Sequence, residues 1–181
     1  MDLLIVYGFV PKMKMNDKTY EMRRLSEFDG DEVFQMLQTI DNNENAFTNP
    51  VKGMNYFDFK KWLKQQNNWS LEKELPDGYV GQTIFWLYDN GVPVGIGKIR
   101  HALTEQSREK GGNIGYAISS RFRGKGYGTV LLGLLLEKAA EMKVKEIMLT
   151  VEKSNPASKR VIEKNGGRLV DENDERWFFC F

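Results

Sequence analysis

The segment from residue 113 to residue 166 constrains the fold more than any other part of the chain. Apolar alternation predicts strands over 113–119 and 146–152. Apolar residues at helical spacing predict a helix over 126–142, and a proline at the first helical position starts a second helix over 156–164. A strand, helix, strand and helix in this order predict a parallel crossover in the C-terminal half of the chain.

The sequence outside this segment predicts helices and antiparallel strands. The expected strands cover residues 20–25, 83–88, 92–100, 168–170 and 176–181, and the expected helices cover residues 29–40 and 56–66. The turn Asp89-Asn90-Gly91 makes a hairpin of the second and third strands, while polar residues 105–112 predict only a turn. The predicted class is therefore α+β, or mixed α/β, with a mostly antiparallel sheet flanked by helices.

The size and composition of the chain are those of one ordinary globular domain. It has 181 residues, of which 41% are hydrophobic and 28% are charged, so a core can form without disulfides or metal. Cys180 and His101 are the only residues of their types, which excludes an intrachain disulfide and a multi-ligand cysteine or histidine metal site. We therefore expect no metal.

The charge and hydropathy of the chain argue against several classes of binding partner. The net charge of +1 argues against a general nucleic-acid or membrane-surface protein. No apolar run approaches the roughly 18 residues that a membrane span requires. The apolar stretch at residues 3–10 follows an acidic residue and precedes no small-residue cleavage site. We expect a cytoplasmic protein with an N-terminal extension over residues 1–18 and a single domain over residues 19–181.

A glycine-rich turn between the strand and the helix favours an anion-binding site. Residues 123–128 read Arg-Gly-Lys-Gly-Tyr-Gly, where glycines let the backbone amides approach a ligand and the helix N-terminus adds partial positive charge. A plain strand-to-helix turn has the same appearance, so this signal is weak alone. The turn lacks the Gly-Lys-Ser/Thr ending of a Walker A loop and the Gly-x-Gly-x-x-Gly spacing of dinucleotide folds.

The start of the second helix supplies an independent signal. Asn155 is a good N-cap and Pro156 fits the first helical position. Capping alone explains these residues when they are considered by themselves. Their distance from the glycine-rich turn makes a shared function the better interpretation.

With these two elements the chain resembles the GCN5-related N-acetyltransferase (GNAT) superfamily. Arg123, Gly126 and Gly128 stand at the three places of the Arg/Gln-x-x-Gly-x-Gly/Ala motif, which binds the coenzyme A pyrophosphate in that family. The resemblance implies a GNAT-like sheet with a parallel splayed strand pair, and acetyl-CoA as cofactor. The implied cofactor-binding residues are Ala117, Ile118, Arg123, Gly124, Lys125, Gly126, Tyr127, Gly128, Thr129, Asn155 and Ser158.

A closer resemblance is to a poorly characterised bacterial branch of predicted acetyltransferases within that superfamily. The residues that carry it are the stretches 99–101, 111–116 and 161–167, which stand in the same order here. This branch implies no defined acceptor substrate.

The resemblance implies acetyl transfer directly from acetyl-CoA to a neutral amine of a small-molecule or peptide acceptor. Many relatives carry a tyrosine that protonates the leaving thiolate, but Ile162 stands at that place. Solvent or another hydroxyl such as Tyr116 would serve instead, or the thiolate leaves unassisted because thiols have a pKa of about 8.5. His101 and Glu105 are the candidate bases, although a structural histidine and a solvated glutamate fit the sequence equally well.

The resemblance and the residues leave further points open. The acceptor site is expected in the N-terminal half, with walls at residues 45–56 and 69–79. A homodimer is common in the family. An acetyl-CoA-binding regulatory or degenerate module without turnover is one alternative, which Ile162 favours. A nucleotide-phosphate binder of unrelated fold is the other.

Overall fold

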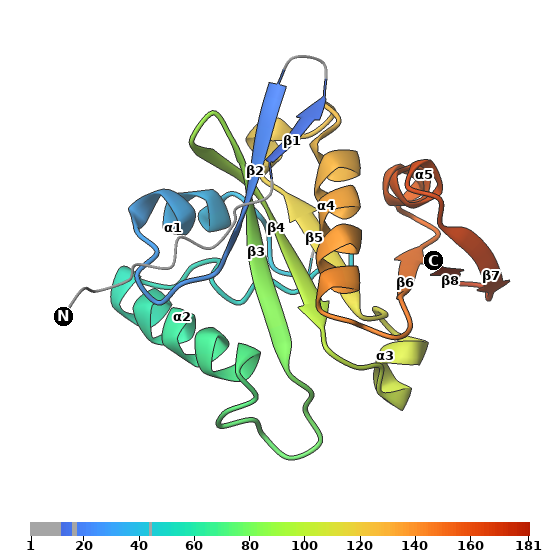
Figure 1. Cartoon of the computed structure of the whole chain (residues 1–181), viewed down its shortest axis with the longest axis horizontal. Helices are drawn as coiled ribbons and strands as arrows, with labels where there is room; N and C mark the ends of the chain where they lie inside the picture. The colour runs from blue at the N-terminus through green and yellow to red at the C-terminus, as the bar shows by residue number, and fades with distance from the viewer. Residues whose placement is uncertain (1–11, 16–17, 44) are drawn as a thin grey trace.

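Two antiparallel sheets form the frame of the molecule (Figure 1). The computed structural model describes residues 12–15, 18–43 and 45–181. The first sheet has the strand order β1-β2-β3-β4-β5 and the second the order β6-β8-β7. The bounds are β1 (Lys12–Met15), β2 (Lys18–Arg24), β3 (Gln82–Asp89), β4 (Val92–Arg100), β5 (Ile114–Ile118), β6 (Met148–Glu152), β7 (Arg168–Glu172) and β8 (Arg176–Cys180).

Helices cover both faces of the first sheet. In Figure 1, α1 and α2 lie on one side of it and α4 on the other, while α5 lies beside the second sheet. The helices are α1 (Asp31–Gln38), α2 (Tyr56–Ser70), α3 (Glu105–Glu109), α4 (Tyr127–Glu141) and α5 (Pro156–Lys164), with a 3₁₀ turn η1 (Ser120–Phe122) before α4. None of the helices described is long and apolar enough to cross a membrane.

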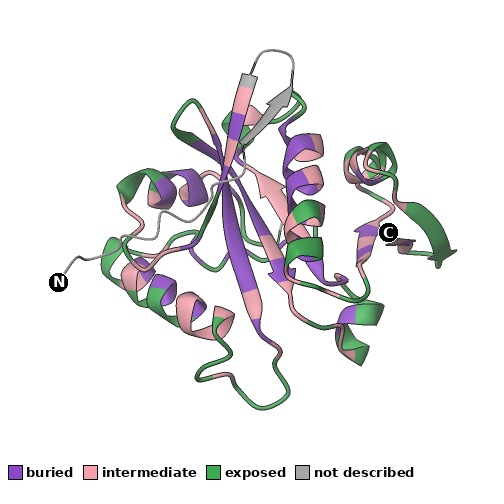
Figure 2. Cartoon of the chain, in the orientation of Figure 1, coloured by how far each residue is buried: buried purple, intermediate pink, exposed green. Residues whose placement is uncertain are grey.

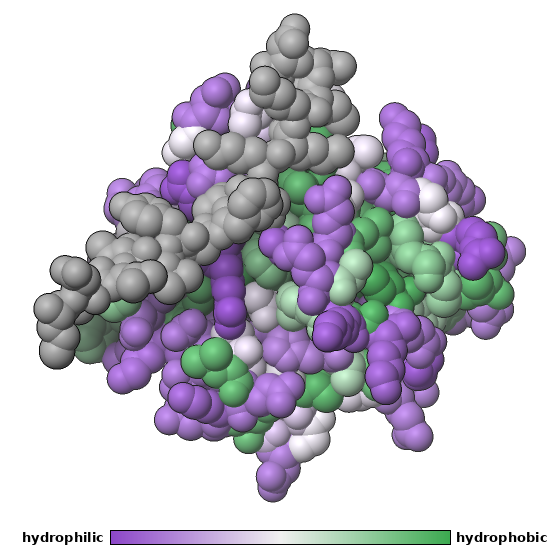
Figure 3. All heavy atoms as spheres, viewed as in Figure 1, coloured by the Kyte–Doolittle hydropathy of each residue, from purple (hydrophilic) through white to green (hydrophobic). Residues whose placement is uncertain are grey.

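The first sheet separates two hydrophobic cores. Successive residues of a strand point to opposite faces, so Trp86 enters the core under α1 and α2 while Leu87 enters the core under α4. Both side chains are fully buried, as is much of β3 and β4 in Figure 2. The second core continues through α4 to Phe179 of the second sheet. Figure 3 shows hydrophobic residues over this region of α4, surrounded by hydrophilic ones.

β5 and β6 meet at one end only. The backbone N–H of Asn113 donates to the carbonyl of Met148 at 2.9 Å, and the Asn113 side chain bonds the N–H of Met148 and the carbonyl of Glu146. All strand pairings within the described residues are antiparallel, so the predicted parallel pair is not confirmed as a hydrogen-bonded ladder. The two strands instead border a cavity, as described below.

The structure departs from the sequence prediction in two local details, while the N-terminal extension stays a prediction. Residues 105–109 form helix α3 rather than a turn, because Thr104 and Ser107 make a reciprocal capping box. α1 begins at Asp31 rather than at residue 29, and the carboxylate of Asp29 accepts from the indole N–H of Trp86 at 2.7 Å. The predicted extension over residues 1–18 lies largely outside the described residues, but its described part, β1, pairs with β2.

Candidate active site

A cavity of about 460 Å³ lies between β5 and β6 and reaches the N-termini of α4 and α5. The predicted cofactor-binding residues line it, with the exception of Lys125, whose Nζ lies 5.6 Å from the ring centroid of Phe122. The described lining residues include three cations, Arg123, Arg160 and Lys164, and no carboxylate. Such a lining suits a ligand with several negative charges.

The glycine-rich turn presents backbone amides to this cavity. Gly124 and Gly126 have φ values of +74° and +86°, which glycine adopts without strain. A methyl group added to either glycine would meet no atom within 4 Å, so the backbone faces open space. The side chain of Arg123 donates to the carbonyl of Ile118 at 3.0 Å and so ties the turn to the end of β5. The geometry is that of an anion cradle at the start of α4.

The start of α5 borders the same cavity. Asn155 is the N-cap of the helix, and its side-chain oxygen accepts from the backbone N–H of Ser158 at 3.1 Å. The capping interpretation of Asn155 is therefore confirmed, and the residue also lines the cavity. Two helix N-termini thus point partial positive charge at one space.

Two hydroxyl groups occupy the cavity wall between β5 and α5. The hydroxyl of Tyr116 lies 2.8 Å from that of Ser158, and burial raises the pKa of Tyr116 to about 12. Ile162 is fully buried in the core, and its aliphatic side chain has no proton to exchange. Tyr116 and Ser158 are thus hydroxyl groups that line the cavity near this helix.

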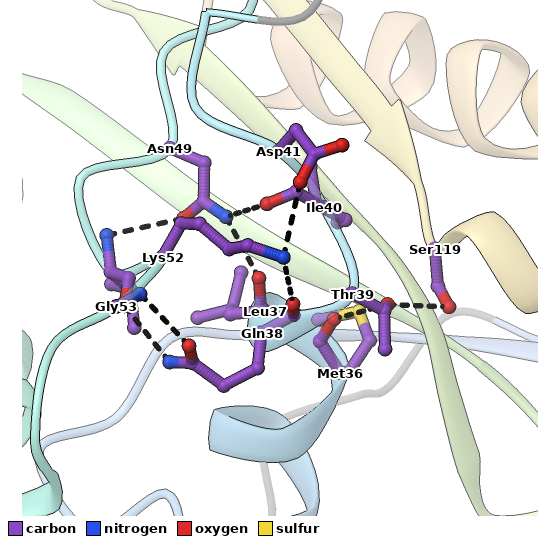
Figure 4. Close-up of polar contacts among 11 residues, drawn as sticks. Met36, Leu37, Gln38, Thr39, Ile40, Asp41, Asn49, Lys52, Gly53 and Ser119 are labelled. Carbon is purple, nitrogen blue, oxygen red and sulfur yellow. Dashed lines mark hydrogen bonds and ion pairs between the residues drawn. The ribbon is translucent and has the colours of Figure 1, made fainter.

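The loop between α1 and α2 closes one end of the cavity. Asn45, Ala46 and Phe47 of this loop are lining residues that the sequence placed only in a broad acceptor wall. The buried side chain of Asn49 shapes the loop by donating to the carbonyls of Leu37 and Ile40 at 2.8 and 2.7 Å (Figure 4).

A hydrogen bond close to this loop connects the end of α1 to the end of β5. The hydroxyl of Thr39, at the end of α1, lies 2.8 Å from the hydroxyl of Ser119, which directly follows β5 (Figure 4). Within the loop, Lys52 forms an ion pair of 3.0 Å with Asp41. These contacts hold the loop against the end of α1 and join that end to the residue that follows β5.

Several lining residues were missed by sequence reasoning. Arg160 and Lys164 lie four residues apart on α5, a spacing that places both on one helix face and that the sequence already displays. Thr150 of β6 accepts from the backbone N–H of Gly111 at 2.7 Å, a contact between distant segments that no local pattern indicates.

The two predicted bases lie outside the cavity lining. His101 sits between Glu72 and Thr83, with ring nitrogens 3.2 Å and 2.9 Å from their side-chain oxygens. Glu105 is the exposed first residue of α3. Their role as bases therefore stays a prediction.

Comparison with family models identifies the domain. The model of the acetyltransferase (GNAT) domain matches residues 20–168. The chain belongs to this GNAT family. The match includes β2 to α5 and every predicted site residue, and the family assignment supports acetyl-CoA as the cosubstrate. A comparison with curated proteins gave no match.

Solved structures confirm the GNAT fold. Ribosomal-protein-S5-alanine acetyltransferase from Vibrio fischeri is 13% identical, with a TM-score of 0.67 over 94% of this chain and 96% of that chain. The N-acetyltransferase PseH from Campylobacter jejuni, in complex with acetyl coenzyme A, is 14% identical with a TM-score of 0.59 over 90% and 97%. An uncharacterized protein from Bacillus halodurans is 17% identical with a TM-score of 0.65 over 94% and 89%.

Proposed function

We propose that this GNAT domain transfers an acetyl group from acetyl-CoA directly to an amine of a small-molecule or peptide acceptor. The observation that carries the proposal is one cavity bordered by the glycine-rich turn, the Asn155 helix start and three cations. The same cavity runs along the edge of β5 that does not pair with β4. A phosphate-rich group with an extended amide-bearing arm suits these features.

Different residues of the chain would bind different parts of the coenzyme. The backbone amides near Gly124 and Gly126, with Arg123, Arg160 and Lys164, would hold the phosphates. Ala117 and Ile118 would offer backbone groups to the arm in the manner of an added strand. Acetyl-CoA supplies the acetyl group in activated form, as a thioester.

Tyr116 is the proposed proton donor. Its hydroxyl keeps its proton at neutral pH, because burial raises the pKa to about 12. Ser158, 2.8 Å away, orients the hydroxyl and connects it to α5. Tyr116 would therefore hold a proton in the cavity wall that could be given to the departing thiolate. Proton transfer of this kind is worth up to several orders of magnitude in rate when the leaving group is poor, and less for a thiol.

His101 and Glu105 are the proposed bases, acting through water because neither lines the cavity. We expect His101→Ala and Glu105→Gln to leave coenzyme binding intact. At least one of them should lower turnover more than tenfold. Full turnover by both variants would refute the assignment.

A coenzyme A release screen across amine classes tests the proposed function. We expect free thiol only with acetyl-CoA and a suitable amine, and none from Gly126→Asp, in which a carboxylate faces the phosphate cradle. Binding of acetyl-CoA without thiol release from any amine would favour the binding-only module. Tight binding of ATP with none of coenzyme A would refute both. The cytoplasmic location and the homodimer stay predictions.

A further inference from the structure

Two basic side chains stand side by side on β4. Lys98 and Arg100 are two residues apart, so they project from the same face of the strand, toward α1, α2 and their loop. The ammonium of Lys98 donates to the carbonyl of Thr48 at 2.7 Å and lies 4.5 Å from the ring centroid of Phe47. One guanidinium nitrogen of Arg100 donates to the carbonyl of Gly112 at 2.8 Å.

Neither cation has an anionic partner within the described part of the chain. Lysine carries three N–H donors and arginine five, whereas each of these side chains has a single acceptor among the described residues. Burial lowers the pKa of both groups, and the charge of Arg100 helps to bring the pKa of Lys98 to about 7. Two partly buried like charges without a counter-ion are costly, and in most proteins such charges are paired.

The pair lies at the end of the cavity that is remote from the phosphate cradle. Lys98 is directly opposite Gly115 in the register of β4 and β5. Gly115 lies three residues before Ile118, or about 10 Å along the strand. Phe47, Gly111 and Gly115 line the cavity at this end. Lys98 contacts Phe47 and pairs with Gly115 in the strand register, and Arg100 lies close to Gly111, so the two cations stand directly behind these lining residues.

We propose that Lys98 and Arg100 bind an anionic oxygen group, a carboxylate or a phosphate, carried by the acceptor amine. This inference rests on the proposed acetyl transfer, because it assigns the cavity end beyond the cofactor arm to the acceptor. The unused N–H donors of the pair provide the hydrogen bonds that an oxyanion needs. The two positive charges also disfavour the ammonium form of an amine held beside them, and only the neutral amine can attack.

The inference predicts that anion binding is coupled to protonation of Lys98. On its own strand Lys98 neighbours Arg100. It pairs with Ile84 of β3 and with Gly115 of β5, and the loop between α1 and α2 contributes Phe47 and Thr48. Arg100 is the charged group among these described neighbours. A bound anion favours protonated Lys98, so it raises the pKa of Lys98, and anion affinity falls as the pH rises above about 7.

Matched amines test the inference through activity. β-Alanine is compared with β-alaninamide, and phosphoethanolamine with ethanolamine, so each pair differs in the anionic group. We expect kcat/KM to be at least tenfold higher for the anionic member of at least one pair, and the identity of that pair distinguishes carboxylate from phosphate. Lys98→Met should abolish the preference, whereas Lys64→Met, which removes an equal charge from the exposed face of α2, should keep it. Equal kcat/KM values within both pairs overturn the inference.

A binding measurement separates this inference from the proposed function. Coenzyme A-saturated protein is titrated with inorganic phosphate while the ¹³C resonance of the Lys98 side chain is followed by NMR. The titration is repeated with acetate, and we expect at least one of the two anions to raise the pKa of Lys98 by about one unit. A pKa that neither anion changes overturns the anion site. Failure of coenzyme A to bind to the wild-type protein would instead refute the proposed function.

Discussion

The two ends of the gap between β5 and β6 both depend on glycine, but for opposite reasons. At the closed end, a methyl group added to Gly112 would lie 1.9 Å from the carbonyl oxygen of Met148. At the open end, a methyl group on Gly126 would meet no atom within 4 Å. Both residues have positive φ. Gly112 lets two backbones touch, whereas Gly126 leaves space for a ligand.

Gly112→Ala is expected to have the largest effect on stability. The added methyl forces β5 away from β6 and also occupies a strained φ of +64°, so we expect a loss of about 4 kcal/mol or more. Gly126→Ala has the strain without the clash and should cost about 1 kcal/mol. Urea denaturation measures both. Similar losses in the two variants would show that the backbones do not meet at the closed end.

Asn113→Ala tests the side-chain hydrogen bonds that join the start of β5 to the start of β6 at the closed end. Its side-chain oxygen accepts from the N–H of Met148 at 2.9 Å, and its amide donates to the carbonyl of Glu146 at 2.6 Å. The side chain is fully buried, so both backbone groups lose their partner and water cannot replace it. We expect a loss of about 3 kcal/mol in the free energy of unfolding.

Asn173→Ala is the matched control for Asn113. Its side chain likewise makes two hydrogen bonds to the backbone, with its oxygen accepting from the N–H groups of Glu175 and Arg176, but in an exposed turn. Water can replace these bonds, so we expect a loss of about 1 kcal/mol or less. Equal losses of unfolding free energy at the two positions would mean that burial does not determine how much the Asn113 hydrogen bonds contribute to stability.

The open end was predictable from the sequence and the closed end was not. Residues 123–128 and Asn155 display their local structure in the sequence, because a glycine turn and an N-cap each act on the helix that follows them. The role of Asn113 depends on Met148, which lies 35 residues away in the sequence, and no local pattern indicates that contact. Likewise, the sequence shows that Lys98 is basic but not that it is partly buried without a carboxylate.

The helices and strands were predicted well where the periodicity was long. α4, α5, β3 and β4 were expected within a few residues of their observed bounds. α3 was missed because its five residues are too few to show a period, and its capping box joins Thr104 to Ser107 rather than to the usual glutamate or glutamine. Phe47 could not be placed on the cavity because its loop is shaped by Asn49, through tertiary hydrogen bonds.

Tyr116→Phe tests the open end by activity. We expect kcat to fall about tenfold, because the proposed proton donor is lost, while acetyl-CoA binding changes little. Tyr88→Phe removes a buried hydroxyl on β3, away from the cavity lining, and should leave kcat unchanged. Rapid-quench kinetics and calorimetric titration measure the two quantities. A Tyr116→Phe enzyme with full kcat would leave solvent, or unassisted departure of the thiolate, as the explanation.

Lys98→Met should have a small effect on stability, and the size of the effect depends on pH. Burial and Arg100 hold the pKa of Lys98 at about 7 in the folded protein, against 10.5 ordinarily. Between these values the unfolded chain binds more protons, so the cost of Lys98 to folding is full below pH 7 and disappears above 10.5. We expect Lys98→Met to stabilise the protein by about 1–2 kcal/mol in acid.

Denaturation of the wild-type protein and of Lys98→Met at about pH 6 and pH 10 measures this difference. The lost bond to the carbonyl of Thr48 lowers the gain at both pH values, and more in acid, where the donor is a charged ammonium. The change with pH therefore gives a lower bound on the cost of the Lys98 charge. A stabilisation that is the same at both pH values would mean that Lys98 is already solvated or paired. A stabilisation confined to acid would mean that the fold keeps an unpaired cation at a cost in stability, which is what an anion-binding acceptor site requires.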